Sequence, residues 1–398
     1  MNQGSLTPGN MVMSQRNYRN ILFISLSQLG MAFSYNFVMV FIPFFIHKVS
    51  LYSSQNTLVW VGLIMGAPSF VAAVVSTFWG SLTVRFSPKK IYMRGLLSHA
   101  VTILLMGFVR NLPLLLALRI VQGLLGGIST VGLIIVSSSS SRERASRDIG
   151  LFQNAMTLGN LIGPPIGALA ASILGYTGAF IGASALIFVT LLFCFFYVVE
   201  VPIETSEKRA PGEQTVNRKT LIGWGLCFTA TVQLMFLPSV LPNVFQGFNI
   251  EQTMALKWAG LVVMLYTATA MIGTYLLCRM AVRIGNERMI FAASISGIVL
   301  QSLLSLSPGI ISFVAIRMLQ TAIIASILPL LYSIFAINLD GKVIGFLNSG
   351  RFGGNAIGPM FGTFILAVSG LSWLYLSISG MSLLALLSFA LFFGFCRK

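Results

Sequence analysis

Uninterrupted apolar segments of membrane-crossing length run through the whole chain. The clearest of them occupy residues 20–46, 57–83, 177–199 and 372–396. A helix of about 20 apolar residues crosses the hydrocarbon core of a bilayer. Hydrophobic residues make up 56% of the chain and charged residues only 9%, too few to cover a soluble protein of this length. The sequence therefore predicts an all-α membrane protein, because helices satisfy their own backbone polar groups in lipid.

Twelve such segments predict twelve transmembrane helices. They lie at residues 20–46, 57–83, 90–109, 112–136, 149–174, 177–199, 220–246, 254–282, 287–307, 309–334, 343–369 and 372–396. The longest polar stretch, 200–219, follows the sixth span. We expect it to be a flexible cytoplasmic linker between an N-terminal half, 1–199, and a C-terminal half, 220–398.

The basic residues are distributed unevenly between the two sides of the membrane. If the N-terminus is cytoplasmic, 19 of the 25 lysines and arginines lie on the cytoplasmic side, and the opposite loops hold only Lys48, Arg110 and Lys257. Cytoplasmic loops carry the excess of positive charge, so we expect both termini in the cytoplasm and the protein in the cytoplasmic membrane. The net charge of +16 is then a topology signal, and nucleic acid is not expected as a partner.

The two halves repeat each other. LALRIVQG at 116–123 matches VAIRMLQT at 314–321, which places Arg119 and Arg317 198 residues apart. VRFSPKK at 84–90 matches VRIGNER at 282–288 with the same separation, and GNLIGP at 159–164 matches GNAIGP at 354–359 with a separation of 195. The pattern predicts two parallel six-helix halves related by pseudo-two-fold symmetry. This architecture is typical of transporters, whose substrate site lies near the midplane between the halves.

Three short motifs resemble those of the major facilitator superfamily. The loop GSLTVRFSPKK at 80–90 resembles its G-x-L-a-D-R-x-G-R-[KR] loop, with Val84 in place of the usual Asp and Ser87 in place of the second Gly. LALRIVQGLLGG resembles the R-x-x-Q-G motif of the drug:proton antiporters, and GNLIGPPIGA at 159–168 resembles their antiporter motif. The matching positions are Gly80, Arg85, Lys89, Lys90, Arg119, Gln122, Gly123, Gly159, Gly163, Pro164 and Gly167, while Ala168 replaces a final Gly.

This resemblance, which covers nearly the whole chain, implies the function. It is to the multidrug efflux subgroup, so it implies a secondary active transporter that works by alternating access, exports its substrate and exchanges it for protons. In the superfamily, the Asp at this position helps to hold the cytoplasmic side closed in the outward-open state. This chain has Val84 there, so it departs from the pattern at the residue on which the strength of that closure depends. We expect a monomer in the lipid bilayer.

The antiporter motif also has a physical interpretation. Its glycines recur every four residues and predict a smooth helix face that another helix can approach closely. Pro164 removes one backbone hydrogen bond and favours a bend. The eleventh span repeats the arrangement with Gly358 and Pro359. We expect these helices to move relative to the opposite half, and static tight packing is the alternative.

Three arginines lie inside apolar segments, where a charge is costly and usually functional. Arg119 in the fourth span, Arg317 in the tenth and Arg351 in the eleventh each lie about 11–13 Å from the nearer helix end. The position equivalent to Arg351 in the first half is Met156. Guanidinium groups in a substrate cavity would bind anionic groups. The alternative is that they brace neighbouring helices through hydrogen bonds.

All nine acidic residues lie in loops or at span ends. Proton coupling commonly uses a carboxylate in the translocation path. Many drug:proton antiporters carry an acid in the first span, where this chain offers Gln28 and Asn36. Arginine cannot readily release a proton. Asp148, at the start of the fifth span, is the remaining candidate for proton coupling.

Neutral polar residues inside the spans are further candidates for the substrate cavity. Beside the arginines we expect it to use Gln28, Asn36, Gln122, Asn154, Gln233 and Gln320. The first hypothesis is export of a small amphipathic or drug-like molecule. The second is a carrier of organic anions or anionic lipids that uses the arginines and need not be proton-coupled. The sequence holds no nucleotide-binding loop, catalytic triad or metal-spaced cluster, so we expect no enzyme activity, cofactor or metal.

Overall fold

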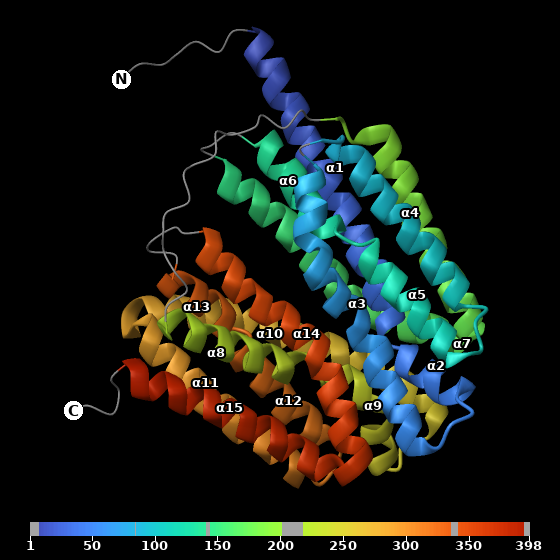
Figure 1. Cartoon of the computed structure of the whole chain (residues 1–398), viewed down its shortest axis with the longest axis vertical. Helices are drawn as coiled ribbons and strands as arrows, with labels where there is room; N and C mark the ends of the chain where they lie inside the picture. Colours follow the sequence, from blue (N-terminus) through green and yellow to red (C-terminus); the bar gives the residue numbers. More distant parts are fainter. Residues whose placement is uncertain (1–7, 84, 141–143, 201–217, 336–340, 394–398) are drawn as a thin grey trace.

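The computed structural model describes residues 8–83, 85–140, 144–200, 218–335 and 341–393, and within these ranges it contains α-helices, one short 3-10 helix and no strand (Figure 1). The α-helices are α1 (Pro8–Met39), α2 (Ile42–Val49), α3 (Ser54–Leu82), α4 (Pro88–Met106), α5 (Leu112–Leu124), α6 (Ile128–Ser139), α7 (Ala145–Tyr197), α8 (Arg218–Met235), α9 (Leu237–Gly247), α10 (Gln252–Ile284), α11 (Asn286–Leu303), α12 (Ile310–Ile324), α13 (Ile327–Phe335), α14 (Gly341–Ser369) and α15 (Leu371–Phe393). The 3-10 helix η1 (Leu304–Leu306) continues α11.

These helices form the twelve predicted spans. The pairs α1–α2, α5–α6, α8–α9 and α12–α13 each make one broken span, and α7 makes two because it is interrupted at Gly175, which has φ 70° and ψ 171°. By length and hydropathy, nine of the described helices could cross a membrane, or ten if the pair α8 and α9, bent by 43°, is counted as one span. Dividing α7 at Gly175 adds one span. The last is α4, whose first turns carry Lys89, Lys90 and Arg94.

The break between α5 and α6 shows how neighbouring helices stabilise an interrupted span. Gly127 has φ 86°, a backbone conformation that glycine adopts readily. The turn frees carbonyl groups at the end of α5, and side chains of α3 and α4 bind them. Trp79 Nε1 donates to the Leu124 carbonyl at 2.8 Å, and Arg94 donates to the Leu125 carbonyl at 3.1 Å. The Arg94 guanidinium also lies 3.4 Å from the centre of the Trp79 ring, so α3 and α4 together hold the break.

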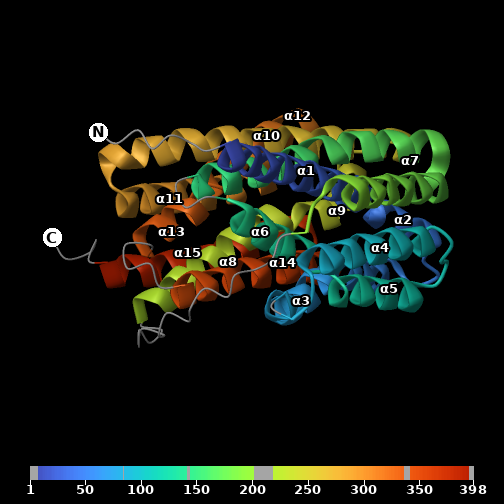
Figure 2. The ribbon, with the colours of Figure 1, turned by 90° about the horizontal axis from the view of Figure 1, so that it is seen from above.

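The helices assemble into two groups, residues 8–200 and 218–393, that meet along two helix pairs. α3 packs against α14 and α7 packs against α10. Both views show these pairs side by side (Figures 1 and 2). In Figure 1 the groups converge near α2 and α9 and diverge toward the end where α1 begins and α15 ends. Most of the expected linker 200–219 lies outside the described residues, so the domain boundaries stay a prediction.

The buried apolar core also joins the groups near α2 and α9. One cluster contains Phe41, the residue before α2, and Phe45 of α2 together with Val240 and Val244 of α9, so it crosses from one group to the other. A second cluster, around Phe389, belongs to the C-terminal group alone. The part of the core that joins the two groups therefore lies at the end remote from the start of α1, which we call the far end.

Candidate functional site

The glycines of the antiporter motif face a helix of their own half. A Cβ added to Gly159 would lie 2.7 Å from the Leu29 carbonyl oxygen, and one added to Gly163 would lie 2.6 Å from the Phe33 carbonyl oxygen. Gly167 meets the backbone of Phe37 in the same way. The smooth face therefore lets α1 approach α7 closely, as the spacing predicts. The neighbour belongs to the same half and not to the opposite one.

The second copy of the motif makes the equivalent contact in the C-terminal half. A Cβ added to Gly354 would lie 2.8 Å from the Phe228 carbonyl oxygen of α8, and one added to Gly358 would lie 3.4 Å from the Val232 carbonyl oxygen. Motif glycines of both halves thus pack on the first helix of their own half. The contact is looser at Gly358 than at Gly159.

The surface between the halves is made by different glycines. A Cβ added to Gly62 of α3 would lie 3.0 Å from Met360 Cα and 3.2 Å from the Pro359 carbonyl oxygen of α14. A Cβ added to Gly260 of α10 would lie 2.9 Å from Pro165 Cα and 3.0 Å from the Pro164 carbonyl oxygen of α7. Gly62 and Gly260 are 198 residues apart, the separation of the sequence repeat. The proline segments of the motif therefore face the opposite half, and the repeat relates the two contacts.

Arg119 is 1% exposed and is held by three helices. Its Nε donates to the Ile64 carbonyl at 2.9 Å, and one terminal nitrogen donates to Gln122 Oε1 at 2.7 Å. The other terminal nitrogen donates to the sulfur of Met39 at 3.0 Å. The Tyr35 ring centre lies 5.8 Å from the guanidinium carbon. The guanidinium thus connects α5 to α1 and α3 and orients Gln122.

Arg317 is fully buried and is held in a similar way, but by other partners. It donates to the Gln233 carbonyl at 2.8 Å, to the Leu234 carbonyl at 3.0 Å and to Gln320 Oε1 at 2.6 Å. Gln320 Nε2 in turn donates to Gln233 Oε1 at 3.0 Å. Both repeat-related arginines therefore bind the glutamine three residues later. Arg119 donates to a carbonyl of the second span of its half and to Met39 of the first, whereas Arg317 donates to carbonyls of the first.

Arg351 differs from the other two arginines because it is only half-buried. Its guanidinium carbon lies 5.3 Å from the ring centre of Phe352, and its Nε is buried without a hydrogen-bond partner. The Cys227 thiol and the Tyr332 hydroxyl are its polar neighbours. Arg351 therefore keeps hydrogen-bonding capacity that the protein does not use. Its role as a ligand stays a prediction, as it does for Arg119 and Arg317.

The remaining predicted residues lie in several places. Gln28 is buried and donates to Ser129 Oγ at 2.9 Å, while Asn154 is exposed. Asp148 is buried in the first turn of α7. Of the loop motif, Gly80 lies near the end of α3, Arg85 and Lys90 are exposed, and Lys89 Nζ donates to the Phe195 carbonyl at 2.8 Å. The structure therefore does not gather all the sequence candidates into one site.

A central cavity of about 180 Å³ lies between the N-terminal half and α14. Two buried atoms of its lining side chains lack a hydrogen-bond partner, namely Gln122 Nε2 and Asn355 Oδ1. Buried polar atoms are nearly always paired, so this donor and this acceptor are available to a ligand. The full lining is Met31, Tyr35, Pro68, Ser69, Ala72, His99, Gln122, Gly123, Gly126, Gly127, Ile128, Ser129, Thr130, Phe352 and Asn355, without lysine, arginine or carboxylate.

The side-chain oxygen of Asn355 is unpaired because the two halves differ at the neighbouring helix. Its equivalent in the first motif copy is Asn160, whose Oδ1 accepts a hydrogen bond of 2.8 Å from Asn36 Nδ2. Asn36 is the residue whose Cβ faces Gly163, and Met235 holds that place opposite Gly358. Methionine has no donor, so the second copy leaves Asn355 unpaired. The asparagine of one copy therefore joins two helices, and that of the other faces the cavity.

Four residues that line the central cavity or form the contact between the halves were not predicted from the sequence. These are Asn355, His99, Gly62 and Gly260. Asn355 lies inside the GNAIGP segment that had been matched to GNLIGP, and the two glycines share the 198-residue separation of Arg119 and Arg317. Extending the repeat residue by residue would have found three of the four. His99 carries no such signal.

Comparison with known proteins agrees with this architecture. The family model of the Major Facilitator Superfamily matches residues 24–256 and 222–397. The chain is 24% identical over 390 residues to the "Multidrug resistance protein MdtG" of Salmonella typhi, which covers 95% of this chain and 96% of that protein.

Solved structures of the same fold also superpose on the chain. A bacterial homologue of the human lysosomal transporter Spinster, in an inward-facing and occupied conformation, has a TM-score of 0.77 at 14% identity and covers 93% of this chain and 95% of its own. The human organic anion transporter MFSD10 (TETRAN) has a TM-score of 0.68 at 16% identity and covers 94% of this chain and 99% of its own. The chain therefore belongs to the major facilitator superfamily and is a multi-pass membrane transporter of small molecules.

Proposed function

We propose that this protein exports a small amphipathic or drug-like molecule across the cytoplasmic membrane by alternating access. The central cavity carries the proposal. It combines apolar and aromatic walls, such as Met31, Tyr35 and Phe352, with the unpaired polar atoms of Gln122 and Asn355. A cavity of this kind favours a ligand with an apolar body and a few polar groups. Because no lysine, arginine or carboxylate lines it, the preferred substrate is neutral or weakly charged.

The export direction rests on the relatives and on the charge distribution. The relative from Salmonella typhi bears the name of a multidrug resistance protein and matches nearly the whole chain. The excess of lysine and arginine near the two termini and the linker supports a cytoplasmic location for them. The halves meet at the far end and diverge toward the end where α1 begins. In this orientation the conformation faces the cytoplasm, where an exporter collects its substrate.

The contacts between the halves support a rocking movement. At Gly62 and Gly260 the opposite half approaches through proline-containing backbone and through small side chains, Thr363 at Gly62 and Ala168 at Gly260. Small residues at a contact between helices leave a smooth surface along which the halves can rotate. The glycine faces of α7 and α14, in contrast, pack on α1 and α8 and tie each motif helix to its own half. The motif helices therefore move with their own halves, and the substrate cavity opens alternately to each side.

We also propose that export of the substrate is coupled to the uptake of protons. Asp148 is buried in the first turn of α7, and His99 is the titratable imidazole in the wall of the central cavity. Either group could carry the proton that exchanges for substrate. The test is to collapse the pH gradient across vesicles that contain the purified protein. Abolished accumulation supports antiport, and unchanged accumulation shows facilitated diffusion or exchange.

Transport into vesicles by an Asn355→Ala variant tests the substrate cavity. The Asn355 oxygen has no partner in the protein, so its removal leaves the fold without a broken hydrogen bond. A hydrogen bond to substrate contributes about 1 kcal/mol, so we expect a several-fold loss of apparent affinity for a neutral amphipathic dye that donates a hydrogen bond. Gln153→Ala, at an exposed position of α7 that is not among the predicted cavity residues, is the control. Equal affinity in both variants would exclude Asn355 from the site.

Arg351 favours a second candidate function, the transport of organic anions or anionic lipids. Its Nε is buried and unpaired, as is that of Arg317, but the terminal nitrogens of Arg119 and Arg317 donate to acceptors of the protein. A guanidinium with free donors binds a carboxylate or phosphate strongly. Under this hypothesis Arg351→Ala abolishes uptake of a labelled organic anion. A wild-type protein that transports a labelled cation and not the anion would exclude the hypothesis.

A further inference from the structure

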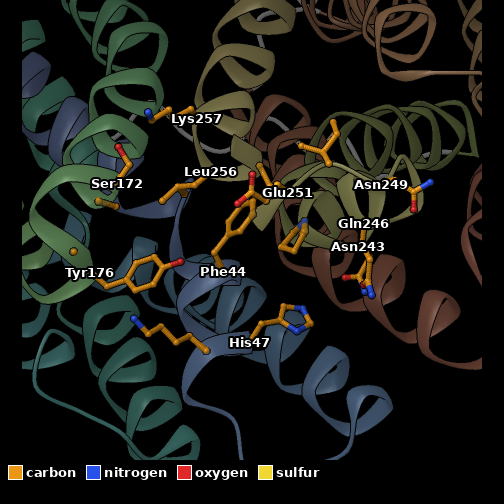
Figure 3. Close-up of a pocket in the computed structure, with 16 residues that line it drawn as sticks. Phe44, His47, Ser172, Tyr176, Asn243, Gln246, Asn249, Glu251, Leu256 and Lys257 are labelled. Atoms are coloured by element: carbon orange, nitrogen blue, oxygen red, sulfur yellow. The ribbon is translucent and has the colours of Figure 1, made fainter. Parts of the chain in front are cut away.

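A second and larger cavity lies between the halves at the far end of the molecule. Its volume is about 1080 Å³. The N-terminal half contributes α2 and the middle of α7, and the C-terminal half contributes α9, the segment before α10, and the start of α10. Figure 3 shows His47 and Phe44 on one wall, Ser172 and Tyr176 on a second, and Asn243 and Gln246 on the opposite one. We call this space the outer cavity, because the charge distribution places it away from the cytoplasm.

The outer cavity has more basic than acidic groups. Lys48, Lys257 and His47 line it, against the single carboxylate of Glu251. The Lys48 ammonium lies 5.4 Å from the ring centre of Tyr176 in α7. Lys257 is exposed, and Figure 3 places it beside Ser172. No described residue forms an ion pair with either lysine, so both charges are available to a ligand.

Two buried polar atoms in the same cavity also lack partners. His47 Nε2 belongs to the N-terminal half and Asn243 Oδ1 to the C-terminal half. The two side chains face each other across the boundary but form no hydrogen bond of normal geometry. Buried polar atoms are nearly always paired, so these two atoms indicate a place for the polar group of a ligand. Phe44 and Leu256 supply apolar surface beside them.

We propose that the outer cavity is a second binding site, distinct from the central one, for an amphipathic anion. Its carboxylate or phosphate head lies between Lys48 and Lys257, and its apolar body lies against Phe44 and Leu256. Two kinds of molecule combine such a head with an apolar body, namely a soluble organic anion and an anionic phospholipid. This inference does not depend on the substrate of the central cavity or on the direction of transport.

Occupation of the outer cavity stabilises the conformation seen here. The walls come from both halves, so a bound ligand contacts both and is released when they separate at the far end. A ligand that binds one conformation better than another shifts the population toward it. The bound anion therefore slows the transport cycle, and the site regulates the transporter.

Binding of dodecanoate to the purified protein, measured by isothermal titration calorimetry, tests the proposal. Its cationic counterpart, dodecyltrimethylammonium, has a similar apolar chain and should bind at least about tenfold more weakly. The double variant Lys48→Gln, Lys257→Gln should lose at least about tenfold in affinity for dodecanoate. Arg110→Gln is the matched control, because Arg110 is an exposed basic residue of an outer loop that does not line the cavity. Equal binding of the two amphiphiles, or unchanged affinity in the double variant, overturns the proposal.

The Glu251→Gln variant distinguishes a specific change in dodecanoate binding from a loss that is caused by misfolding. Removing the one carboxylate of the cavity should strengthen dodecanoate binding several-fold, a gain that damage to the fold cannot produce. Weaker or unchanged binding in this variant contradicts the proposal. Native mass spectrometry identifies the source of the anion. Retained phosphatidylglycerol that is lost in the double variant shows a lipid ligand, and dodecanoate binding without retained lipid shows a soluble one.

Discussion

Gly62 of α3 and Gly260 of α10, 198 residues apart, make the same contact with the opposite half. Each rests on a Gly-Pro segment, Gly62 on the one at Pro359 and Gly260 on the one at Pro164. Residues related by the sequence repeat therefore make equivalent contacts where the two halves touch. Since neither glycine has a side chain, the two backbones approach closely, and a side chain at either position would hold the far end apart.

Gly260→Ala should therefore shift the protein away from the conformation seen here. The added Cβ would lie 2.9 Å from Pro165 Cα and 3.0 Å from the Pro164 carbonyl oxygen, and backbone atoms cannot rotate aside. Overpacking of this kind costs about 1–3 kcal/mol, which changes a two-state population about tenfold or more. The measurement is the labelling rate of a cysteine introduced at Ala171, a buried residue that lines the outer cavity and should become more accessible.

Gly182→Ala in α7 is the control for this substitution. A Cβ at Gly182 meets no atom within 4 Å, and alanine is the better helix former. We expect the labelling rate at position 171 to equal that of the parent protein. If Gly260→Ala also leaves the rate unchanged, the contact between α10 and α7 does not hold the far end closed.

The two copies of the Gly-Pro motif should differ in their tolerance of a side chain. Gly159→Ala places a Cβ 2.7 Å from the Leu29 carbonyl oxygen, whereas Gly358→Ala places one 3.4 Å from the Val232 carbonyl oxygen, an ordinary contact distance. We expect Gly159→Ala to lower the midpoint of thermal unfolding, with a loss of about 1–3 kcal/mol. Gly358→Ala should change it little. Equal midpoints for the two variants would show that α1 can move away from α7 without cost.

Much of the fold could be predicted from the sequence because membrane spans are encoded locally. Length and hydrophobicity of the apolar segments are sufficient to locate twelve spans, and the repeat identifies the halves. The breaks inside spans depend on other helices and were not predictable in the same way. Gly127 marks one such break, but Trp79 and Arg94, from distant segments, bind the carbonyl groups that it frees.

The site was less predictable because polar residues in spans have two uses. Arg119 and Gln122 were chosen as cavity residues, yet Arg119 donates to protein acceptors and only Gln122 keeps a free atom at the cavity. Composition cannot distinguish a paired side chain from an unpaired one. Asn160 and Asn355 occupy equivalent sequence positions, and only the partner on the neighbouring helix decides which of them is free.

Substitution of Arg317 should separate bracing from ligand binding. Arg317→Ala removes the donors to the carbonyl groups of Gln233 and Leu234. Each hydrogen bond from a charged group contributes about 1.5–3 kcal/mol, so we expect a clear fall in the thermal unfolding midpoint. Arg351→Ala should change the midpoint little, because its guanidinium donates no hydrogen bond to a described residue, whereas the terminal nitrogens of Arg317 donate three. An Arg317→Ala protein of normal stability that no longer binds substrate would instead identify Arg317 as a ligand.

Gly127→Ala should destabilise the broken span between α5 and α6. Gly127 has φ 86°, and a residue with a Cβ pays about 1–2 kcal/mol in that left-handed region. The new Cβ would also lie 2.8 Å from the Cβ of Trp79, the side chain that binds the Leu124 carbonyl. We expect a lower unfolding midpoint together with a change in tryptophan fluorescence, since the indole must shift. Gly150→Ala, where a Cβ meets nothing within 4 Å, should change neither signal, and an unchanged spectrum in Gly127→Ala would show that the indole does not depend on the break.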